Sequence, residues 1–182
     1  MNKLNKVALV TVFSMLACVA FAADSMTEPE ALKALFPDAT FKSEVKTLTD
    51  AQVKDIGEKS GLEVDVASEK TQNVNIAYVN NKVVGYVIEE TTKGKWGNIV
   101  FMTAINPNGS VKEVVVLASN EKKGKPVTQP HFLNQFVGKT LADKLEVKKD
   151  IQGISGATIS SRAMTKGVKK VLNVFAALNL KN

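Results

Sequence analysis

The chain has 182 residues, 45% of them hydrophobic, and a formal net charge of +6. This length and apolar content suit one globular domain with its own core, and they exclude disorder over most of the chain. The lysine-rich stretches lack interleaved aromatic residues, which argues against nucleic-acid binding.

The first 22 residues have the layout of a secretory signal. Lys3 and Lys6 precede an uncharged apolar run at residues 7–22, which ends with the small residues Ala20 and Ala22. We therefore predict a signal peptide at 1–22 and one domain at 23–182, exported to the periplasm or outside the cell. A retained anchor is an alternative, although the run is short for a span of about 20 residues. Membrane contact is expected to be peripheral only, unless this segment is retained. Residues 15–18 also weakly resemble a lipobox.

The residue inventory excludes several kinds of site. Cys18 is the only cysteine and leaves with the signal, so the mature chain has no disulfide, thiol catalysis or thiolate metal site. His131 is the only histidine, and one ligand cannot build a histidine metal site. We expect His131 to be structural or at the surface, and we predict no metal site.

Two helices are predicted first along the domain. Thr27 is an N-cap candidate with Glu30 three residues later, as in a capping box, and Pro37 ends this helix. A second helix follows Thr49 and ends near Gly61. From residue 64 the apolar period changes to two, which is typical of strands.

Four strands are expected at residues 74–79, 83–89, 99–105 and 111–118, joined by short turns. Short turns favour antiparallel pairing. A further helix begins near Pro130 and stops at Gly138. The last helix carries one apolar stripe, formed by Ile159, Ala163, Met164, Val168, Val171, Leu172 and Phe175. The predicted fold class is α+β, a twisted, mainly antiparallel sheet flanked by helices.

The loop before the last helix reads Ser155-Gly156-Ala157-Thr158. A helix N-terminus offers unpaired N–H groups and the positive end of the dipole, so this loop could bind an anion. The hydroxyls of Ser155, Thr158, Ser160 and Ser161 and the charges of Arg162 and Lys166 would add to such a site. A helix start capped by serine or threonine, with no ligand, is the alternative. Nucleotide hydrolysis is disfavoured because the loop lacks the Lys-Ser/Thr ending of a P-loop. Nucleophilic catalysis is disfavoured because no base lies next to these hydroxyls in the sequence.

Residues 155–161, SGATISS, resemble the flavinylation motif of the FMN-binding domain family. That family includes the flavin subunits of the Rnf complex and of the Na+-translocating NADH:quinone reductase. The resemblance covers most of residues 35–172 in order, and its further segments are residues 35–39, 94–117, 120–124 and 132–139. One departure stands three residues before the motif serine. The family usually has an aspartate there, whereas this chain has Gln152, and the nearest aspartate is Asp150.

The resemblance implies FMN joined through its phosphate to the Thr158 hydroxyl as a phosphoester. A separate flavin transferase, which uses FAD and a divalent metal, would make this bond. It also implies contacts from the loop to the phosphate and a border to the ring from the loop after the sheet. We expect Trp96, which stands between Gly94 and Gly97, to stack on the flavin ring. The expected cofactor-binding residues are Thr158, Ser155, Gly156, Ala157, Ile159, Trp96, Glu121 and Gly124. Trp96 as a partly exposed core residue, and residues 121 and 124 as a solvated charged loop, are the alternatives.

The function expected from this resemblance is an exported electron carrier, rather than an enzyme with its own substrate. The chain has no motif for a second cofactor, so it needs redox partners: cytochromes, a quinone-linked membrane complex or another flavoprotein. One alternative is an exported flavin-dependent reductase of a small acceptor. The other is a non-catalytic exported binding module with an anion site.

Overall fold

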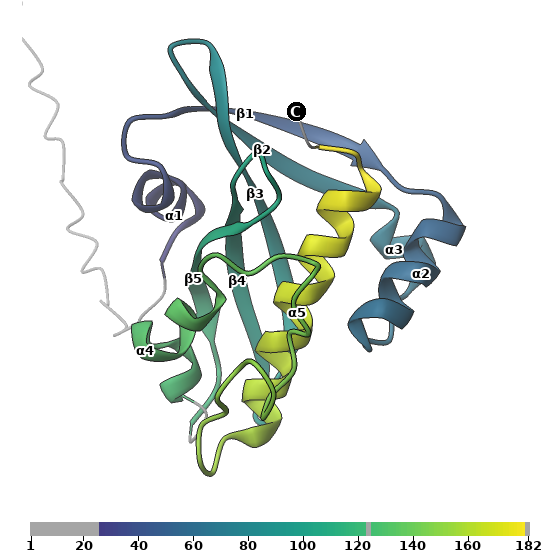
Figure 1. The fold of residues 1–182 in the computed structure, drawn as a ribbon, viewed down its shortest axis with the longest axis vertical. Coiled ribbons are helices and arrows are strands. Elements are labelled where there is room, and N and C mark those ends of the chain that lie inside the picture. Colours follow the sequence, from purple (N-terminus) through teal and green to yellow (C-terminus); the bar gives the residue numbers. More distant parts are fainter. Residues whose placement is uncertain (1–25, 123–124, 181–182) are drawn as a thin grey trace, which may run out of the picture.

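A five-stranded antiparallel sheet, in the order β1-β2-β3-β4-β5, runs through the centre of the structure (Figure 1). The computed structural model describes residues 26–122 and 125–180, so the predicted signal at 1–22 lies outside the described residues. Each strand pairs with the next one along the chain, as expected from the short turns. The strands are β1 Thr40–Thr47, β2 Thr71–Val79, β3 Lys82–Lys93, β4 Asn98–Ile105 and β5 Val111–Ser119.

Helices cover both faces of this sheet. Five α-helices are described: α1 Glu28–Leu35, α2 Asp50–Ser60, α3 Val66–Glu69, α4 Pro130–Leu133 and α5 Thr158–Ala177. Two short 3-10 helices flank α4, η1 Lys125–Thr128 and η2 Asn134–Phe136. Because side chains alternate along a strand, each face of the sheet builds its own apolar cluster. The larger cluster lies under α5 and α2, and the smaller lies under α1.

Helix α5 is the element that fixes the position of the predicted site. Its buried side chains include Met164, Val168 and Phe175, and each large apolar side chain contributes about 1.5–3 kcal/mol on burial. Gly167 permits a close approach to the sheet, because a Cβ there would lie 2.5 Å from Thr92 Cγ2 and 2.7 Å from Phe101 Cζ. The N-terminus of α5 is therefore held rigidly at one end of the molecule (Figure 1).

The predicted fold class is confirmed, and four details of the prediction are wrong. Strand β1 was not predicted; it lies at the sheet edge, where charged side chains hide the apolar alternation. Residues 66–69 form a short helix within the stretch where the period of two was expected, and β2 begins at Thr71, three residues before the predicted strand. The helix near Pro130 has four residues and continues as η2. Ile159 is exposed rather than part of the buried stripe. Across residues 26–122 and 125–180, we find no helix with the length and apolar character to cross a membrane.

Candidate functional site

The loop before α5 leaves the helix without a side-chain cap. Ala157 occupies the N-cap position, with φ −125° and ψ 32°, and no side chain accepts a hydrogen bond there. Gly156 has φ +77°, a left-handed conformation that favours glycine, and a Cβ at this position would have no atom within 4 Å. The hydroxyl cap of an ordinary helix start is therefore not formed, and the positive end of α5 remains for another acceptor.

Two buried serines hold this loop in shape. Ser161 Oγ accepts a hydrogen bond from the Ile154 N–H at 3.0 Å and donates to the Ala157 carbonyl at 3.0 Å. Ser160 Oγ donates to Glu121 Oε2 at 2.6 Å. The prediction that Ser160 and Ser161 offer hydroxyls to an anion is therefore wrong, since both are used within the fold. The hydroxyl-bearing side chains left exposed in this loop are those of Ser155 and Thr158.

Glu121 joins this loop to the turn between β3 and β4. Its side chain is buried, with 6% of the residue exposed. Oε1 accepts from the Trp96 N–H at 2.8 Å, while Oε2 accepts from Ser160. Gly94 allows this contact, because a Cβ there would lie 2.3 Å from Oε1. One carboxylate thus fixes two segments that are far apart in the sequence, and we call this contact of Glu121 with Trp96 and Ser160 the Glu121 joint. A solvated position, the alternative for Glu121, is wrong.

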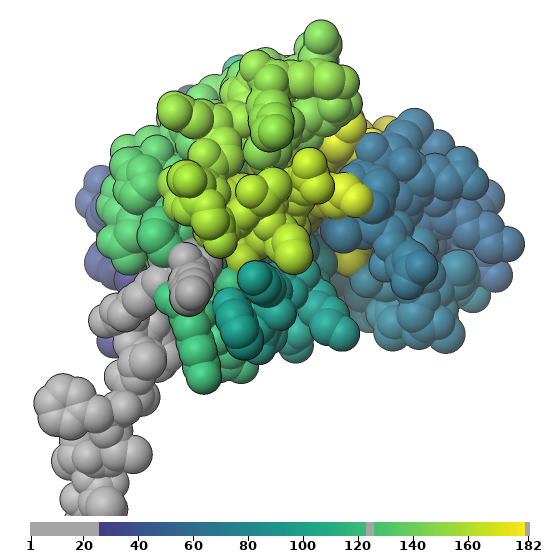
Figure 2. Space-filling model, turned by 90° about the horizontal axis from the view of Figure 1, so that it is seen from below, coloured from purple at the N-terminus to yellow at the C-terminus, as the bar shows by residue number. Residues whose placement is uncertain are grey.

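Two exposed apolar side chains flank this joint. Trp96 is 50% exposed, and its backbone N–H donates to Glu121. Ile159 is 53% exposed and directly precedes Ser160, whose hydroxyl also donates to Glu121. Lys95 Nζ lies 5.5 Å from the centre of the indole ring. Figure 2 shows the turn between β3 and β4 beside the start of α5. Trp96 is thus not a core residue, and its position suits stacking on a planar group.

These groups form a donor set that fits a phosphate-bearing planar cofactor. The exposed Thr158 hydroxyl stands at the first position of α5, where the helix dipole favours negative charge. Gly156 lets the backbone approach a ligand closely, and Trp96 and Ile159 offer apolar surface on the same end of the molecule. The structure therefore brings together seven of the eight predicted site residues. The eighth, Gly124, lies outside the described residues.

Comparison with known families gives this site its identity. Residues 94–173, which include both sides of the Glu121 joint, match the model of the FMN-binding domain. The chain therefore contains a segment that matches the FMN-binding domain. FMN binding is supported by this match as well as by the fit of the site.

Two curated relatives are similar to this FMN-binding protein in sequence, and each is named as one component of a ferredoxin:NAD(+) oxidoreductase complex. The first belongs to the proton-translocating complex of Clostridium ljungdahlii and is 38% identical over 104 residues, which are 53% of this chain and 56% of that protein. The second belongs to the Na(+)-translocating complex of Acetobacterium woodii and is 31% identical over 137 residues, 70% of this chain and 65% of that protein. The alignments thus span less than two thirds of either relative.

Two solved structures share the fold of this FMN-binding protein. NqrC of Shewanella oneidensis aligns with a TM-score of 0.56 at 24% identity, over 80% of this chain and 85% of that one. The corresponding component of the Na(+)-translocating NADH-quinone reductase of Parabacteroides distasonis aligns with a TM-score of 0.58 at 16% identity, over 82% of each chain. At these identities the likeness shows the fold alone.

The FMN-binding domain has no carboxylate at the position of Gln152, and Asp150 does not replace it. The Asp150 carboxylate accepts from the N–H groups of Leu145 at 3.0 Å and Glu146 at 2.8 Å, and Lys139 Nζ lies 3.4 Å away. Burial acts to raise the pKa of Asp150, but these hydrogen bonds and the lysine together lower it by more than burial raises it. The pKa is therefore below its ordinary value. Asp150 therefore serves to hold its own loop.

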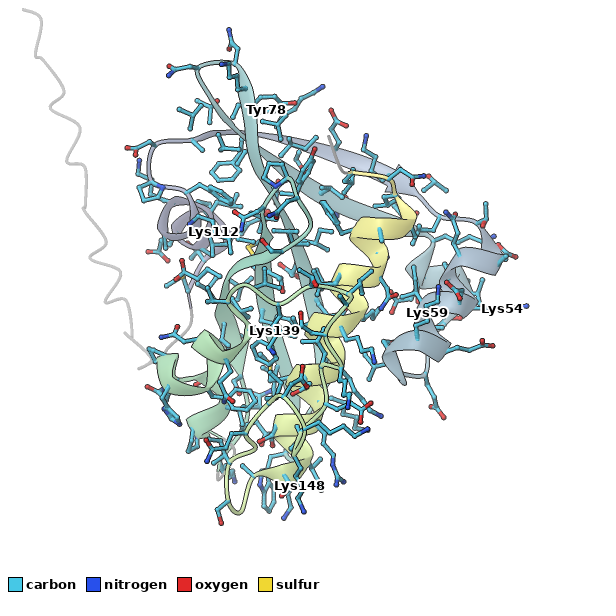
Figure 3. All side chains as sticks on the ribbon, in the orientation of Figure 1. Lys54, Lys59, Tyr78, Lys112, Lys139 and Lys148 are labelled. Carbon is cyan, nitrogen blue, oxygen red and sulfur yellow. The ribbon has the colours of Figure 1, made fainter. Side chains whose placement is uncertain are left out.

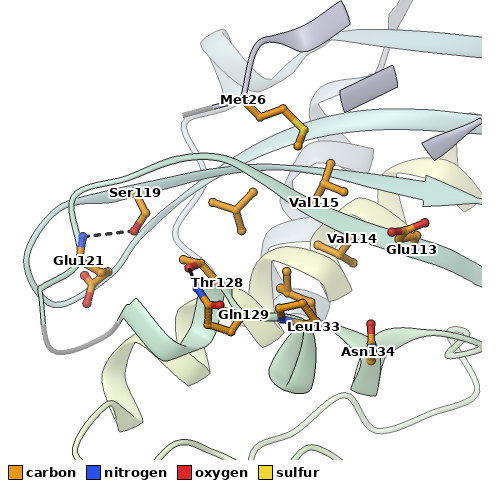
Figure 4. Close-up of a pocket in the computed structure, with 12 residues that line it drawn as sticks. Met26, Glu113, Val114, Val115, Ser119, Glu121, Thr128, Gln129, Leu133 and Asn134 are labelled. Carbon is orange, nitrogen blue, oxygen red and sulfur yellow. Dashed lines mark hydrogen bonds between the residues drawn. The ribbon is translucent and has the colours of Figure 1, made fainter. Parts of the chain in front are cut away.

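A groove of about 480 Å³ adjoins the site along β5 and α4 (Figure 4). Its volume falls in the range of ligand pockets, about 300–1,000 Å³. Glu121 lies at one end (Figure 4), and Val114, Val116 and Leu133 are apolar lining residues. Of the predicted site residues that the structure describes, Glu121 alone lines this groove, so the groove borders the FMN site without containing Thr158 or Trp96.

Proposed function

We propose that this protein is an exported electron carrier that holds FMN through a phosphoester on Thr158. The observation that carries the proposal is the exposed Thr158 hydroxyl at the uncapped start of α5, within a family-matched FMN-binding segment. Ser155 is exposed in the same loop, but it lies before Gly156 and outside the first turn of the helix. Position therefore favours threonine as the acceptor.

The attachment reaction needs a separate transferase. The Thr158 oxygen forms a bond to the phosphorus on the riboflavin side of FAD, the pyrophosphate bond breaks, and AMP leaves. The hydroxyl proton passes to a base that the transferase supplies. The Thr158 loop itself contributes an accessible hydroxyl and a positive helix end that stabilises the negative phosphate.

Each part of the site then has a separate task. When bound, FMN supplies reversible one- and two-electron chemistry. The tether on Thr158 keeps the flavin at a high effective concentration in a compartment where a free cofactor would be diluted away. Trp96 and Ile159 offer apolar surface to the ring, and Glu121 holds the two segments that carry them in register.

The partner is proposed to be a membrane-bound redox complex. Both curated relatives are named as subunits of ferredoxin:NAD(+) oxidoreductase complexes. We extend that role to this chain, with electrons entering from one component of such a complex or from a cytochrome and leaving to another. The FMN-binding chain carries electrons between them and has no substrate of its own.

Intact mass spectrometry tests the attachment. The protein is produced with its export segment in a host that contains a flavin transferase, beside Thr158→Ala and the matched control Ser155→Ala. Wild type and Ser155→Ala should gain the mass of one FMN less one water and stay yellow after denaturation, whereas Thr158→Ala should lose the adduct. An adduct that persists in Thr158→Ala would refute the assignment. The same spectra test export, because cleavage after Ala22 removes the mass of residues 1–22.

A further inference from the structure

The net positive charge of the chain is concentrated next to the flavin attachment site. Residues 139–170 contain eight basic and three acidic side chains, whereas residues 26–138 contain 13 basic and 14 acidic ones. Helix α5 has four basic side chains and no acidic one. Lysines are distributed along the whole chain, but their excess over acidic residues is gathered in this segment. Lys170 does not add to it at the surface, because it is buried and paired with Glu69 and Glu90.

Part of this charge lines a cleft beside α5, which we name the basic cleft. It has a volume of about 400 Å³, and its charged lining residues are Lys59, Arg162, Lys166, Lys169, Glu58 and Glu146. Figure 3 shows Lys59 across from α5, and Lys148 at the end of the molecule where α5 begins. The basic cleft therefore opens between α2, the start of α5 and the loop that precedes it.

The hydrogen bonds in the basic cleft leave most of its positive charge uncompensated. Lys166 Nζ donates to the Gly61 carbonyl at 2.7 Å and Lys169 Nζ donates to the Lys144 carbonyl at 3.1 Å, and carbonyl oxygens carry no formal charge. Two further lining charges are already paired outside the cleft. Lys59 is paired with Asp55 at 2.7 Å, and Glu146 is paired with Lys149. The remaining lining charges are those of Arg162, Lys166 and Lys169 against Glu58.

This charge follows the same helix face as the attachment residue. Residues four apart on a helix share a face and are separated by about 6 Å along the axis. Thr158, Arg162 and Lys166 are all exposed and follow this spacing. The exposed apolar side chains of Trp96 and Ile159 lie at the same end of α5, since Ile159 follows Thr158 and Glu121 joins Trp96 to Ser160. Protein interfaces have this anatomy, with aromatic and apolar residues at the centre and a charged rim.

We infer that the basic cleft and the adjoining face of α5 dock an acidic redox protein. This inference rests on the proposed function. A concave cationic surface suits the protruding carboxylates of a protein better than the flat face of an anionic membrane. Docking here places the surface of the partner against the Thr158 end of α5. Charge complementarity accelerates encounter by about 10- to 1,000-fold in favourable cases, and salt weakens it.

Graded charge changes at Arg162 test the docking surface. The flavin-loaded wild type, Arg162→Gln and Arg162→Glu are mixed with a reduced acidic flavodoxin as the probe, which loses one electron as the flavoprotein gains one. At about 20 mM salt, the second-order rate should fall by roughly twofold to threefold for the glutamine variant and roughly threefold to tenfold for the glutamate variant. Near 500 mM salt the difference should largely vanish.

Lys82→Glu is the matched control, because it makes the same charge change at the exposed β2–β3 turn, at the opposite end of the molecule from the start of α5. The inference is overturned if Lys82→Glu slows the reaction as much as Arg162→Glu. It is also overturned if the Arg162 variants lose binding to anionic lipid vesicles but keep the rate with flavodoxin.

An NMR titration separates this inference from the proposed function. Unlabelled flavodoxin is added to the isotope-labelled protein without bound flavin, and amide shifts should cluster around residues 158–169 and 59–61. Clustered shifts in a chain that never acquires FMN would support docking while the proposed function fails. Shifts scattered over the whole surface, in a chain that does carry FMN, would refute docking alone.

Discussion

At the scale of single residues, the site depends on one buried carboxylate. Among residues 26–122 and 125–180, Glu121 accepts one hydrogen bond on each oxygen, from the Trp96 N–H and from Ser160. Hydrogen bonds to a charged group contribute about 1.5–3 kcal/mol each. Loss of either donor leaves a buried carboxylate oxygen without its partner, so the joint between α5 and the β3–β4 turn should weaken as a unit.

We expect Ser160→Ala to lower the unfolding free energy by about 1–3 kcal/mol, because Glu121 Oε2 loses its hydrogen bond in a buried position. Thermal unfolding should shift downward by roughly 2–12 °C. Trp96 is the only tryptophan, so its fluorescence reports directly on this joint and its emission should change. Ser155→Ala is the control, since an exposed serine should change stability by less than about 0.5 kcal/mol. Unchanged emission and melting in Ser160→Ala would contradict the role of Glu121.

Sequence patterns could identify the loop that ends at Thr158 but not the residues that support it. The order Ser-Gly-Ala-Thr before a helix predicts an accessible threonine at a positive helix end, and the structure has this arrangement. The roles of Ser160 and Ser161 depend on Glu121 and Ile154 respectively. The partner of Ser160 is 39 residues away, and no local pattern encodes such a pairing. Periodicity wrongly places Ile159 in the buried stripe, because it does not show where the packing of a helix begins.

At the scale of secondary structure, the strands with a clear apolar pattern were predicted, and the one whose pattern is weak, β1, was not. Strands β2 to β5 have apolar runs bounded by turn residues, which periodicity detects. Strand β1 carries Lys42, Glu44 and Lys46, which pair with one another along an exposed edge. Such charges protect an edge strand from aggregation, and they also remove the pattern by which a strand is recognised.

The packing of α5 makes a second test at this scale. Gly167→Ala would gain about 1 kcal/mol of helix propensity in an isolated helix. Here the new methyl group would meet Thr92 and Phe101 at less than 3 Å, and overpacking costs about 1–3 kcal/mol. We expect a net loss of unfolding free energy, measured by urea denaturation, while Arg162→Ala on the exposed face stays near wild type. A more stable Gly167→Ala variant would show that α5 does not press against the sheet at this point.

At the scale of the whole molecule, a buried ionic cluster links α5 to the sheet and to α3. Lys170 Nζ lies 2.6 Å from Glu69 Oε1 and 2.9 Å from Glu90 Oε2. One ammonium group faces two carboxylates, so one negative charge is in excess. The Glu90 side chain is the more buried of the two, with 9% of it exposed against 26% for Glu69. Glu90 is therefore the carboxyl group that should bind a proton first.

Burial raises the pKa of Glu90 from 4.5 to about 7, although Lys170 acts to lower this pKa. Burial also acts to lower the pKa of Lys170, but Glu90 and Glu69 raise it further, so the lysine remains charged. A carboxyl group with a higher pKa in the folded state binds its proton more tightly there. Its contribution to stability is complete below about pH 4.5 and is lost as the pH rises through about 7.

Glu90→Gln should remove this pH dependence. The rise in the pKa of Glu90 from 4.5 to about 7 corresponds to about 3 kcal/mol of unfolding free energy. Between pH 4.5 and pH 8, wild type should therefore lose about that much stability relative to the variant. Urea unfolding of both proteins across this range measures the difference, and the other carboxylates cancel because both proteins share them. Parallel curves would mean that Lys170 holds Glu90 ionised throughout. The expected divergence would place a protonated Glu90 in the contact between α5 and the sheet at mildly acidic pH.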